Sequence, residues 1–317
     1  MATIEAQGLS KRYGDKQAVQ DLSFRVDPGS VTGFLGPNGS GKSTTMRLML
    51  GLDNGQGTTT FDGTTFRSLR APMRHVGALL EAKPFHPTRS ARNHLRLLAA
   101  PNGIPSTRVD EVLDMVGLTS VARGKPRKFS LGMGQRLGIA AALLGDPHTL
   151  ILDEPANGLD PQGIQWLRRL LADLAGQGRS VFVSSHLLAE MALMADRLVV
   201  IGRGRLIASG PVEDFIRSSR SNAVVVRTPD MGTLGPVLGD RGAYVLGQPD
   251  GSFAVTGMEP ALVGDAAHDV GARLHELTRR EATLEEAFLE ATGMSEEFIG
   301  QAGALTGEPG SVRGEDR

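Results

Sequence analysis

Cysteine is absent from the 317 residues of this sequence. Its absence excludes disulfide frameworks, thiolate zinc sites and cysteine nucleophiles, and it fits a reducing compartment such as the cytosol. Long apolar runs are also missing, since stretches such as residues 138–144 fall far short of the ~20 residues that a membrane-spanning helix requires. The first residues lack the basic start and apolar stretch of a signal peptide. A role at a membrane would therefore need another chain to cross it.

Lysine is scarce as well. Only six of the 34 basic residues are lysines, and none follows Lys128. Because lysine is rare in this chain, a lysine inside a glycine-rich loop is a specific signal. The formal net charge of −1 gives no bulk attraction to nucleic acid or to anionic lipid, so no nucleic-acid partner is expected.

The clearest motif is GxxxxGK[ST], which begins at Gly36 and lies between a short apolar run and a helical pattern, at residues 31–35 and 45–52. The loop comprises Gly36, Pro37, Asn38, Gly39, Ser40, Gly41, Lys42, Ser43 and Thr44. Its glycines let backbone N–H groups point at phosphates, and the helix start adds a positive dipole. Lys42 would reach the β- and γ-phosphates, Ser43 would hold Mg²⁺, and Thr44 would add a phosphate contact.

A second motif is the apolar run at residues 150–152, which ends in the carboxylates Asp153 and Glu154. In isolation such a pair usually caps a strand end or stays solvated. Beside a phosphate loop, Asp153 can hold Mg²⁺ through water and Glu154 can polarise an attacking water. The two motifs together predict a nucleoside-triphosphate site.

The domain organisation follows from changes in pattern along the chain. Residues 1–218 alternate short apolar runs with helical patterns, which predicts an α/β core with a mostly parallel sheet and, at about residues 88–146, an inserted helical lobe. Residues 219–295 predict a small α+β domain of ferredoxin-like order, closed by a helix that starts with a capping box at Thr283. The Gly-rich, charged residues 296–317 predict a disordered tail.

The ordered set of motifs over residues 4–210 resembles the nucleotide-binding subunit of ABC transporters, a P-loop ATPase. The resemblance makes the glycine-rich loop the Walker A motif and the strand before Asp153 the Walker B motif. It also places Tyr13 as the aromatic that stacks on adenine, Asp160 in the D-loop, and His186 as the histidine that steadies the γ-phosphate. It implies ATP and Mg²⁺ as the bound ligands.

The family signature, LSGGQ in its usual form, is matched with changes by residues 129–133. Ser130 and Gly132 remain, whereas Leu131 and Met133 replace a glycine and a glutamine. A hydroxyl and free N–H groups at a helix start would still serve the γ-phosphate that is bound on the opposite subunit. We therefore expect Ser130 and Gly132 to contact nucleotide.

A second departure from the family occurs at Glu81, where a glutamine normally ends the Q-loop strand. A carboxylate can accept a hydrogen bond from water or ligate Mg²⁺, but it cannot donate a hydrogen bond. Glu81 together with Ser-Leu-Gly-Met is similar to the subgroup that exports bacitracin and lantibiotic-type peptides. The resemblance thus implies catalytic roles for Glu154, His186, Lys42 and Glu81, and metal-binding roles for Ser43, Asp153 and Glu81.

The function implied is that of an ATP-hydrolysing exporter subunit. It would form one half of a homodimeric or heterodimeric head-to-tail pair and energise a separate integral-membrane permease. Its place would be cytoplasmic, peripheral on the inner face of the cell membrane. The permease contact would include residues 83–87 and 90–94. The cargo is not encoded in this chain.

Three other classes share parts of this chemistry. DNA-repair and chromosome-organising ATPases need long coiled coils or zinc modules, and neither heptad runs nor cysteines occur here. Translation factors of the superfamily carry two sets of motifs in one chain, and this sequence has one. A non-hydrolysing nucleotide-gated module stays open because of Glu81 and the altered signature.

Overall fold

The computed structural model describes residues 3–80, 85–86 and 88–293. The chain divides into two compact units, the first ending at Val212 and the second beginning at Glu213. The change in sequence pattern placed this boundary at residue 218, so helix α8 (Val212–Arg217) falls almost entirely in the second unit instead. Within the described residues, no helix combines the length and the apolar character that crossing a membrane requires.

The first unit is built around a six-stranded sheet with the order β10-β9-β3-β8-β7-β6. Its strands are β3 (Ser30–Leu35), β6 (Val76–Leu79), β7 (Thr149–Leu152), β8 (Ser180–Ser185), β9 (Arg197–Gly202) and β10 (Arg205–Pro211). All neighbours pair in parallel except β10, which pairs with β9 antiparallel. Every residue of β7 and β8 is buried, as expected for central strands covered on both faces. The predicted mostly parallel sheet is confirmed.

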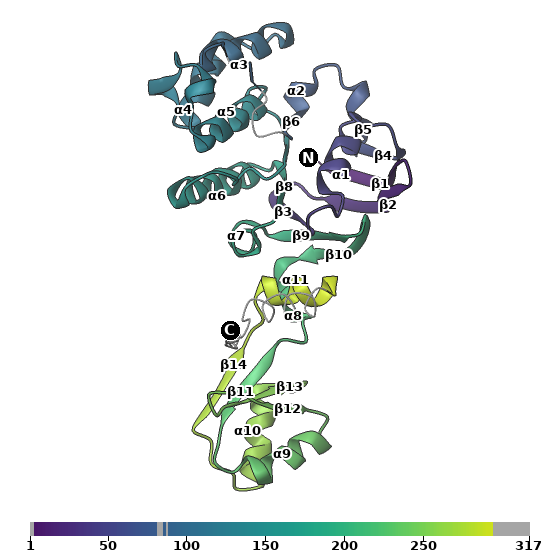
Figure 1. Ribbon diagram of the computed structural model, residues 1–317, viewed down its shortest axis with the longest axis vertical. Helices are drawn as coiled ribbons and strands as arrows, with labels where there is room; N and C mark the ends of the chain where they lie inside the picture. Colours follow the sequence, from purple (N-terminus) through teal and green to yellow (C-terminus); the bar gives the residue numbers. More distant parts are fainter. Residues whose placement is uncertain (1–2, 81–84, 87, 294–317) are drawn as a thin grey trace, which may run out of the picture. The chain divides into compact units, whose positions relative to one another are not determined.

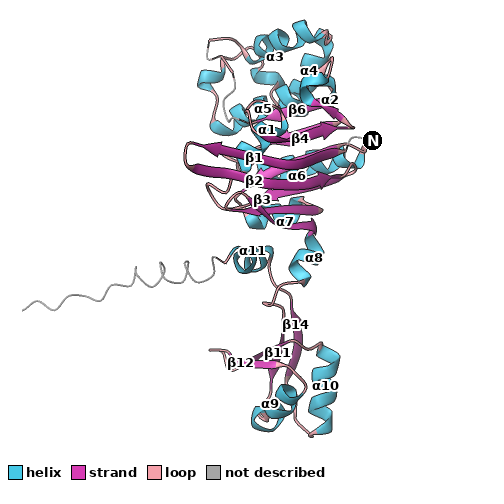
Figure 2. Cartoon of the chain, turned by 90° about the vertical axis from the view of Figure 1, so that its right-hand side faces the viewer, coloured by secondary structure: helices cyan, strands magenta, loops and turns pink. Residues whose placement is uncertain are grey.

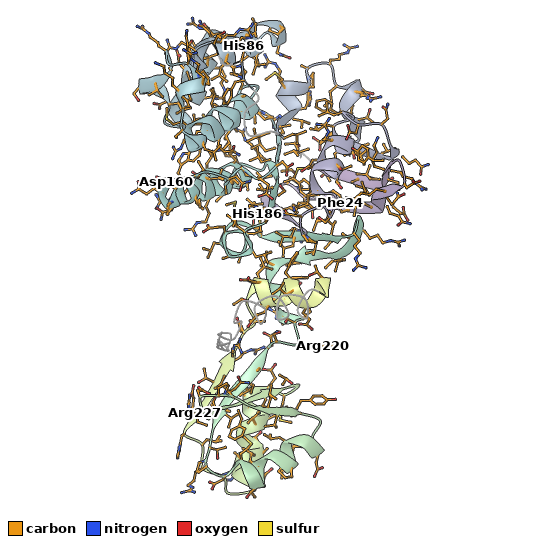
Figure 3. The ribbon with its side chains drawn as sticks, viewed as in Figure 1. Phe24, His86, Asp160, His186, Arg220 and Arg227 are labelled. Carbon is orange, nitrogen blue, oxygen red and sulfur yellow. The ribbon has the colours of Figure 1, made fainter. Side chains whose placement is uncertain are left out.

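A second, antiparallel sheet of the same unit was not predicted. Its order is β2-β1-β4-β5, with β1 (Ile4–Tyr13), β2 (Lys16–Val26), β4 (Gln56–Phe61) and β5 (Thr64–Thr65). The two sheets share one core, where Phe182 of β8 lies 5.3 Å from Phe24 of β2 and 4.9 Å from Phe34 of β3, measured between ring centroids. Figure 3 labels Phe24 within the first unit. The half-polar alternation of β1 and β2 is a weaker signal than the continuous apolar runs of the parallel strands.

Some helices of the first unit flank the larger sheet, and others form a separate group. They are α1 (Lys42–Met49), α2 (Pro72–His75), α3 (Ala91–Ala99), α4 (Ser106–Met115), α5 (Leu131–Leu143), α6 (Pro161–Gly176) and α7 (Leu188–Met194). The helical lobe predicted at residues 88–146 consists of α3, α4 and α5 with 3₁₀ turns and loops between them. Pro101, Gly103 and Pro105 lie between α3 and α4, and Gly117 and Pro126 lie between α4 and α5. Figure 1 shows these three helices grouped apart from β1, β2 and β4.

The second unit contains a four-stranded antiparallel sheet with the order β12-β13-β11-β14. Its elements run β11 (Ala223–Arg227), α9 (Met231–Asp240), β12 (Tyr244–Gly247), β13 (Phe253–Thr256), α10 (Pro260–Asp269), β14 (Glu276–Arg280) and α11 (Leu284–Thr292). This is the ferredoxin-like order of elements. The apolar core that joins the sheet to α9 and α10 includes Val226, Leu234 and Val263. Figure 2 shows both helices beside this sheet.

The helix at the end of the second unit, α11, begins with a capping box. Thr283 caps α11 by accepting a hydrogen bond from the N–H of Glu286, and the Glu286 carboxylate accepts one from the N–H of Thr283. This is the predicted capping box. The tail predicted at residues 296–317 lies outside the described residues.

Candidate functional site

The glycine-rich loop joins β3 to α1, and its backbone explains its glycines. Gly41 precedes α1 in a left-handed conformation with φ +107°, which side chains larger than hydrogen disfavour. A Cβ atom on Gly36 would lie 2.6 Å from the carbonyl oxygen of Ile201. Helix α1 begins at Lys42, three residues before the predicted start, so Lys42, Ser43 and Thr44 form its first turn. Their backbone N–H groups have no partner within the helix and are available to an anion.

Lys42 is a nearly buried cation, with 8% of its surface exposed. Its ammonium donates a hydrogen bond to the carbonyl oxygen of Gly36 at 2.7 Å. Burial lowers the pKa of Lys42, while Glu154 and Asp153 oppose this shift by favouring the charged form. A neutral carbonyl compensates a buried positive charge less well than a phosphate does. The environment of Lys42 therefore favours the binding of an anion.

A cavity of about 530 Å³ lies over this loop. Its lining comprises Tyr13, Lys16, Ala18, Asn38, Gly39, Gly41, Lys42, Ser43, Thr44, Asp153, Glu154, Asn157 and His186. Ten of these residues were predicted from the sequence. Lys16, Ala18 and Asn157 were not, although Lys16 follows Tyr13 closely and could have been noticed as a second cation. Gly36, Pro37 and Ser40 belong to the same loop and do not line the cavity.

The acidic residues and the histidine meet where β7 and β8 end. Oε2 of Glu154 lies 2.7 Å from Nδ1 of His186 and also accepts a hydrogen bond from the backbone N–H of His186 at 3.3 Å. Asp153 accepts a hydrogen bond from the hydroxyl of Ser184. Adjacent parallel strands bring their carboxyl ends to one edge of a sheet, and ligands bind there in open α/β folds. This edge and the Lys42 loop thus face the same cavity.

Tyr13 has its ring fixed at the edge of the cavity. Its hydroxyl donates a hydrogen bond to Asp53 at 2.8 Å, and Asp53 also accepts two from Arg47, at 3.2 and 3.3 Å. The bond to Asp53 raises the pKa of Tyr13, and the bonds from Arg47 hold the pKa of Asp53 below its usual value. The ammonium of Lys11 lies 4.8 Å from the ring centroid. Sequence reasoning found Tyr13 but missed Asp53, which lies 40 positions away.

Ser130, Gly132 and Asp160 do not line the Lys42 cavity. Ser130 caps α5 by accepting a hydrogen bond from the N–H of Met133 at 3.2 Å, and Asp160 caps α6 by accepting one from Gly163 at 2.9 Å. Figure 3 labels Asp160 and His186, which lie on separate segments of the first unit. Gly132 packs against the segment that precedes Asp160, because a Cβ there would lie 2.9 Å from the carbonyl oxygen of Gly158. Glu81 lies outside the described residues.

The fold and the cavity define a P-loop nucleotide-binding protein, and comparisons with known proteins narrow that class. A family model described as ABC transporter matches residues 19–157. A second model, described as a domain of unknown function (DUF8746), matches residues 222–285. The solved structure titled "Structure of ATP binding subunit of ABC transporter" is similar with a TM-score of 0.62 and 28% identity, over 68% of this chain and 92% of that chain.

Three curated ATP-binding proteins are similar to this chain over most of its length or most of their own. The uncharacterized ABC transporter ATP-binding protein YhcH of Bacillus subtilis (strain 168) is 36% identical over 94% of this chain and 99% of its own length. The bacitracin transport ATP-binding protein BcrA of Bacillus licheniformis is 40% identical, over 68% of this chain and 72% of its own. The lantibiotic transport ATP-binding protein SrtF of Streptococcus pyogenes is 36% identical, over 64% and 89%.

The chain belongs to the family of ABC transporter ATP-binding proteins. It is accordingly an ATP-binding subunit and an ATPase. The predicted similarity to the bacitracin and lantibiotic subgroup is confirmed by the two relatives that carry those names. The match to YhcH extends over nearly the whole chain, so the second unit is shared with that relative.

Proposed function

We propose that the chain hydrolyses MgATP as one half of a head-to-tail dimer and thereby drives a separate membrane permease. One observation carries the dimer: the cavity over Lys42 contains Glu154 and His186 but not Ser130 or Gly132. One chain therefore carries two half-sites that it does not bring together. A second subunit in the head-to-tail arrangement would present Ser130 and the free N–H groups at the start of its α5 to the γ-phosphate.

The donor set of the cavity fits a magnesium ion. Ser43 offers an exposed hydroxyl and Asp153 a carboxylate on the same cavity, and oxygen ligands of this kind suit Mg²⁺. When bound, the ion would neutralise charge on the β- and γ-phosphates. Lys42 would reach the same phosphates, while Glu154 would orient the attacking water and accept its proton. His186 would steady the γ-phosphate beside Glu154.

The proposed transport role is the export of a peptide antibiotic, drug or similar compound, from a position on the inner face of the cell membrane. Its support is the similarity to BcrA and SrtF, whose names state bacitracin and lantibiotic transport. The second unit has no catalytic role in this proposal and would support the dimer or regulate it.

One residue of the surface that the sequence assigned to the permease contact is buried. His94 is 94% buried with its ring 6.1 Å from that of Phe85, so its side chain is not offered to a partner. His86 and Asn93 are exposed and are the better candidates within the described part of residues 83–87 and 90–94. Residues 83, 84 and 87 lie outside the described residues.

The proposal is tested by measuring phosphate release from the purified chain, alone and with any multispan membrane protein that is found to be encoded beside its gene. Stable co-purification with that protein and stimulated hydrolysis are the expected results. ATP binding without hydrolysis in both preparations would instead support a nucleotide-gated regulatory module. A neighbouring permease that carries its own ATPase domain would contradict the proposed partnership.

The ring of Tyr13 is expected to contribute the affinity for adenine. Tyr13→Ala should raise the KM for ATP about tenfold, because stacking of a base on an aromatic ring contributes roughly 1–3 kcal/mol. Tyr13→Phe should stay closer to the wild type, since it retains the ring and loses only the bond to Asp53. Steady-state hydrolysis against ATP concentration measures both. Tyr244→Ala, at the chain's other tyrosine, is the control, and an unchanged KM in Tyr13→Ala would exclude the stacking role.

Glu81 is expected to affect turnover and not binding. Glu81→Gln restores the amide that is usual in the family, replaces the carboxylate with a neutral group and regains a hydrogen-bond donor. ATP affinity should stay within about twofold of the wild type, whereas permease-coupled hydrolysis should change by about threefold or more. Comparing ATP titrations with hydrolysis in the reconstituted complex separates the two effects. Unchanged transport and hydrolysis would refute a special role for Glu81.

A further inference from the structure

Glu154 has an unusual backbone conformation for its residue type. Its φ is +50°, in the left-handed region that residues other than glycine seldom occupy and that costs about 1–3 kcal/mol. In this conformation the Glu154 side chain contacts His186. Such a conformation persists only where neighbouring groups hold it. Two buried polar side chains contact the backbone of Glu154, and neither was found from the sequence.

The first is Ser184, which is completely buried on β8. Its hydroxyl accepts a hydrogen bond from the backbone N–H of Glu154 at 2.9 Å and donates one to the carboxylate of Asp153. A hydroxyl has one proton to donate and can accept as well, so this geometry uses both capacities. The bond to an ionised carboxylate is of the stronger, charge-assisted kind. One side chain thus fixes the carboxylate of Asp153 and the backbone of Glu154.

The second is Gln135, which is 1% exposed on α5. Its Nε2 donates a hydrogen bond to the backbone carbonyl oxygen of Glu154 at 3.1 Å. Its Oε1 is buried without a hydrogen-bond partner among the described residues. A polar amide in this position costs free energy of desolvation, and that cost is only partly offset. Ser184 and Gln135 therefore bind the two polar backbone groups of the same residue from two different elements, and the carbonyl oxygen of Glu154 also accepts a hydrogen bond from the backbone N–H of Asn157 at 3.1 Å.

The origin of Gln135 adds a further consequence. Helix α5 begins just after Ser130, which caps it and belongs to the signature segment. In the proposed head-to-tail dimer, Ser130 contacts the nucleotide that is bound on the second subunit. Glu154 of the same chain acts on the nucleotide that is bound by its own Lys42 loop. The bond between Gln135 and Glu154 is therefore a direct connection, within one chain, between parts of two different ATP sites.

We propose that Ser184 and Gln135 are positioning residues for hydrolysis that hold the backbone of Glu154 in its left-handed conformation. Helix α5 begins beside the nucleotide that is bound on the second subunit. Through Gln135, the same helix positions the carboxylate of Glu154, which acts on the nucleotide bound by its own chain. The inference rests on the proposed catalytic role of Glu154. It deepens that role by naming what keeps the carboxylate in place and what links the two sites.

Ser184→Ala and Gln135→Met test the positioning role in the full-length protein assembled with its permease. Each is expected to lower kcat about 10–100-fold, the range expected when a buried hydrogen bond to the reacting group's support is lost. The KM and the binding affinity for MgATP should stay within about twofold. Ser184→Thr retains the hydroxyl and should recover kcat to within about threefold of the wild type.

Matched controls separate positioning from a general loss of stability. Ser180→Ala removes a buried serine hydroxyl at the other end of β8, and Gln56→Met makes the same change as Gln135→Met at an exposed position on β4. Both should have near wild-type kcat. The positioning role is overturned if Ser180→Ala lowers kcat as much as Ser184→Ala, if Ser184→Thr fails to recover activity, or if affinity falls in step with kcat.

The link between the sites has its own test in a double-mutant cycle. If Ser130 acts on Glu154 through Gln135, the two substitutions should not act independently. The fold-loss of kcat in the double variant Ser130→Ala, Gln135→Met should then be at least threefold smaller than the product of the two single fold-losses. Multiplicative effects would overturn the link. Glu154→Gln belongs in the same series. Normal turnover in that variant would refute the proposed function itself, whereas its inactivity beside an active Ser184→Ala and Gln135→Met would refute only the positioning role.

Discussion

Glu154→Gln is expected to bind MgATP with nearly wild-type affinity and to hydrolyse it at least ~10²-fold more slowly, the usual size of a general-base contribution. Glutamine has the same shape as glutamate and can still form a hydrogen bond with His186, whose Nδ1 lies 2.7 Å from Oε2. The amide cannot accept the proton of the attacking water at neutral pH. Phosphate release and an equilibrium titration with ATP measure the two effects separately.

A second readout follows from the proposed dimer. ATP that is bound but not hydrolysed should hold two Glu154→Gln subunits closed, so the variant should elute as a dimer with MgATP and dissociate without it. Wild-type protein should lose this dimer as it consumes ATP. Glu213→Gln, at an exposed position on α8, is the matched control and should behave as the wild type. Rapid turnover by Glu154→Gln would show that another group activates the water.

Lys42→Met is expected to abolish ATP binding, with a loss of affinity of ~10²-fold or more, because it removes the buried charge that we propose to contact the phosphates. Methionine retains the aliphatic part that fills the space behind the loop. The variant should therefore fold, and hydrolysis should fall to background for lack of bound substrate. Titration with a fluorescent ATP analogue measures the affinity. Lys125→Met, at an exposed position in the helical lobe, is the control.

The stability of the nucleotide-free protein gives an independent check on Lys42. Burial lowers the pKa of Lys42 below its ordinary value of 10.5, so the folded protein holds this proton less tightly than the unfolded chain does. The charged lysine therefore costs stability below the lowered pKa, and this cost disappears as the pH rises through 10.5. At neutral pH, Lys42→Met should have a melting temperature no lower than the wild type, yet show no upward shift with MgATP. A preserved shift would contradict the role of Lys42.

Much of the site could be predicted because its parts are short and local. The Lys42 loop needs glycines at fixed spacings to turn its backbone, and Asp153 and Glu154 follow directly on a buried apolar strand. The groups that support these residues could not be predicted in the same way. Asp53 contacts Tyr13 across 40 positions, and Ser184 contacts Glu154 across 30. A serine in a buried strand has no pattern that names its distant partner.

The amino-acid sequence by itself determined the phosphate loop, the acidic strand end, the capping box at Thr283 and the membership of the ATP-binding family, because each depends on residue types at fixed spacing along the chain. Only the tertiary structure decided that Lys42, Glu154 and His186 face one cavity while Ser130 lies outside it. It also decided that Glu154 is held from β8 and α5, because strand pairing and helix packing bring together residues that local spacing leaves unrelated.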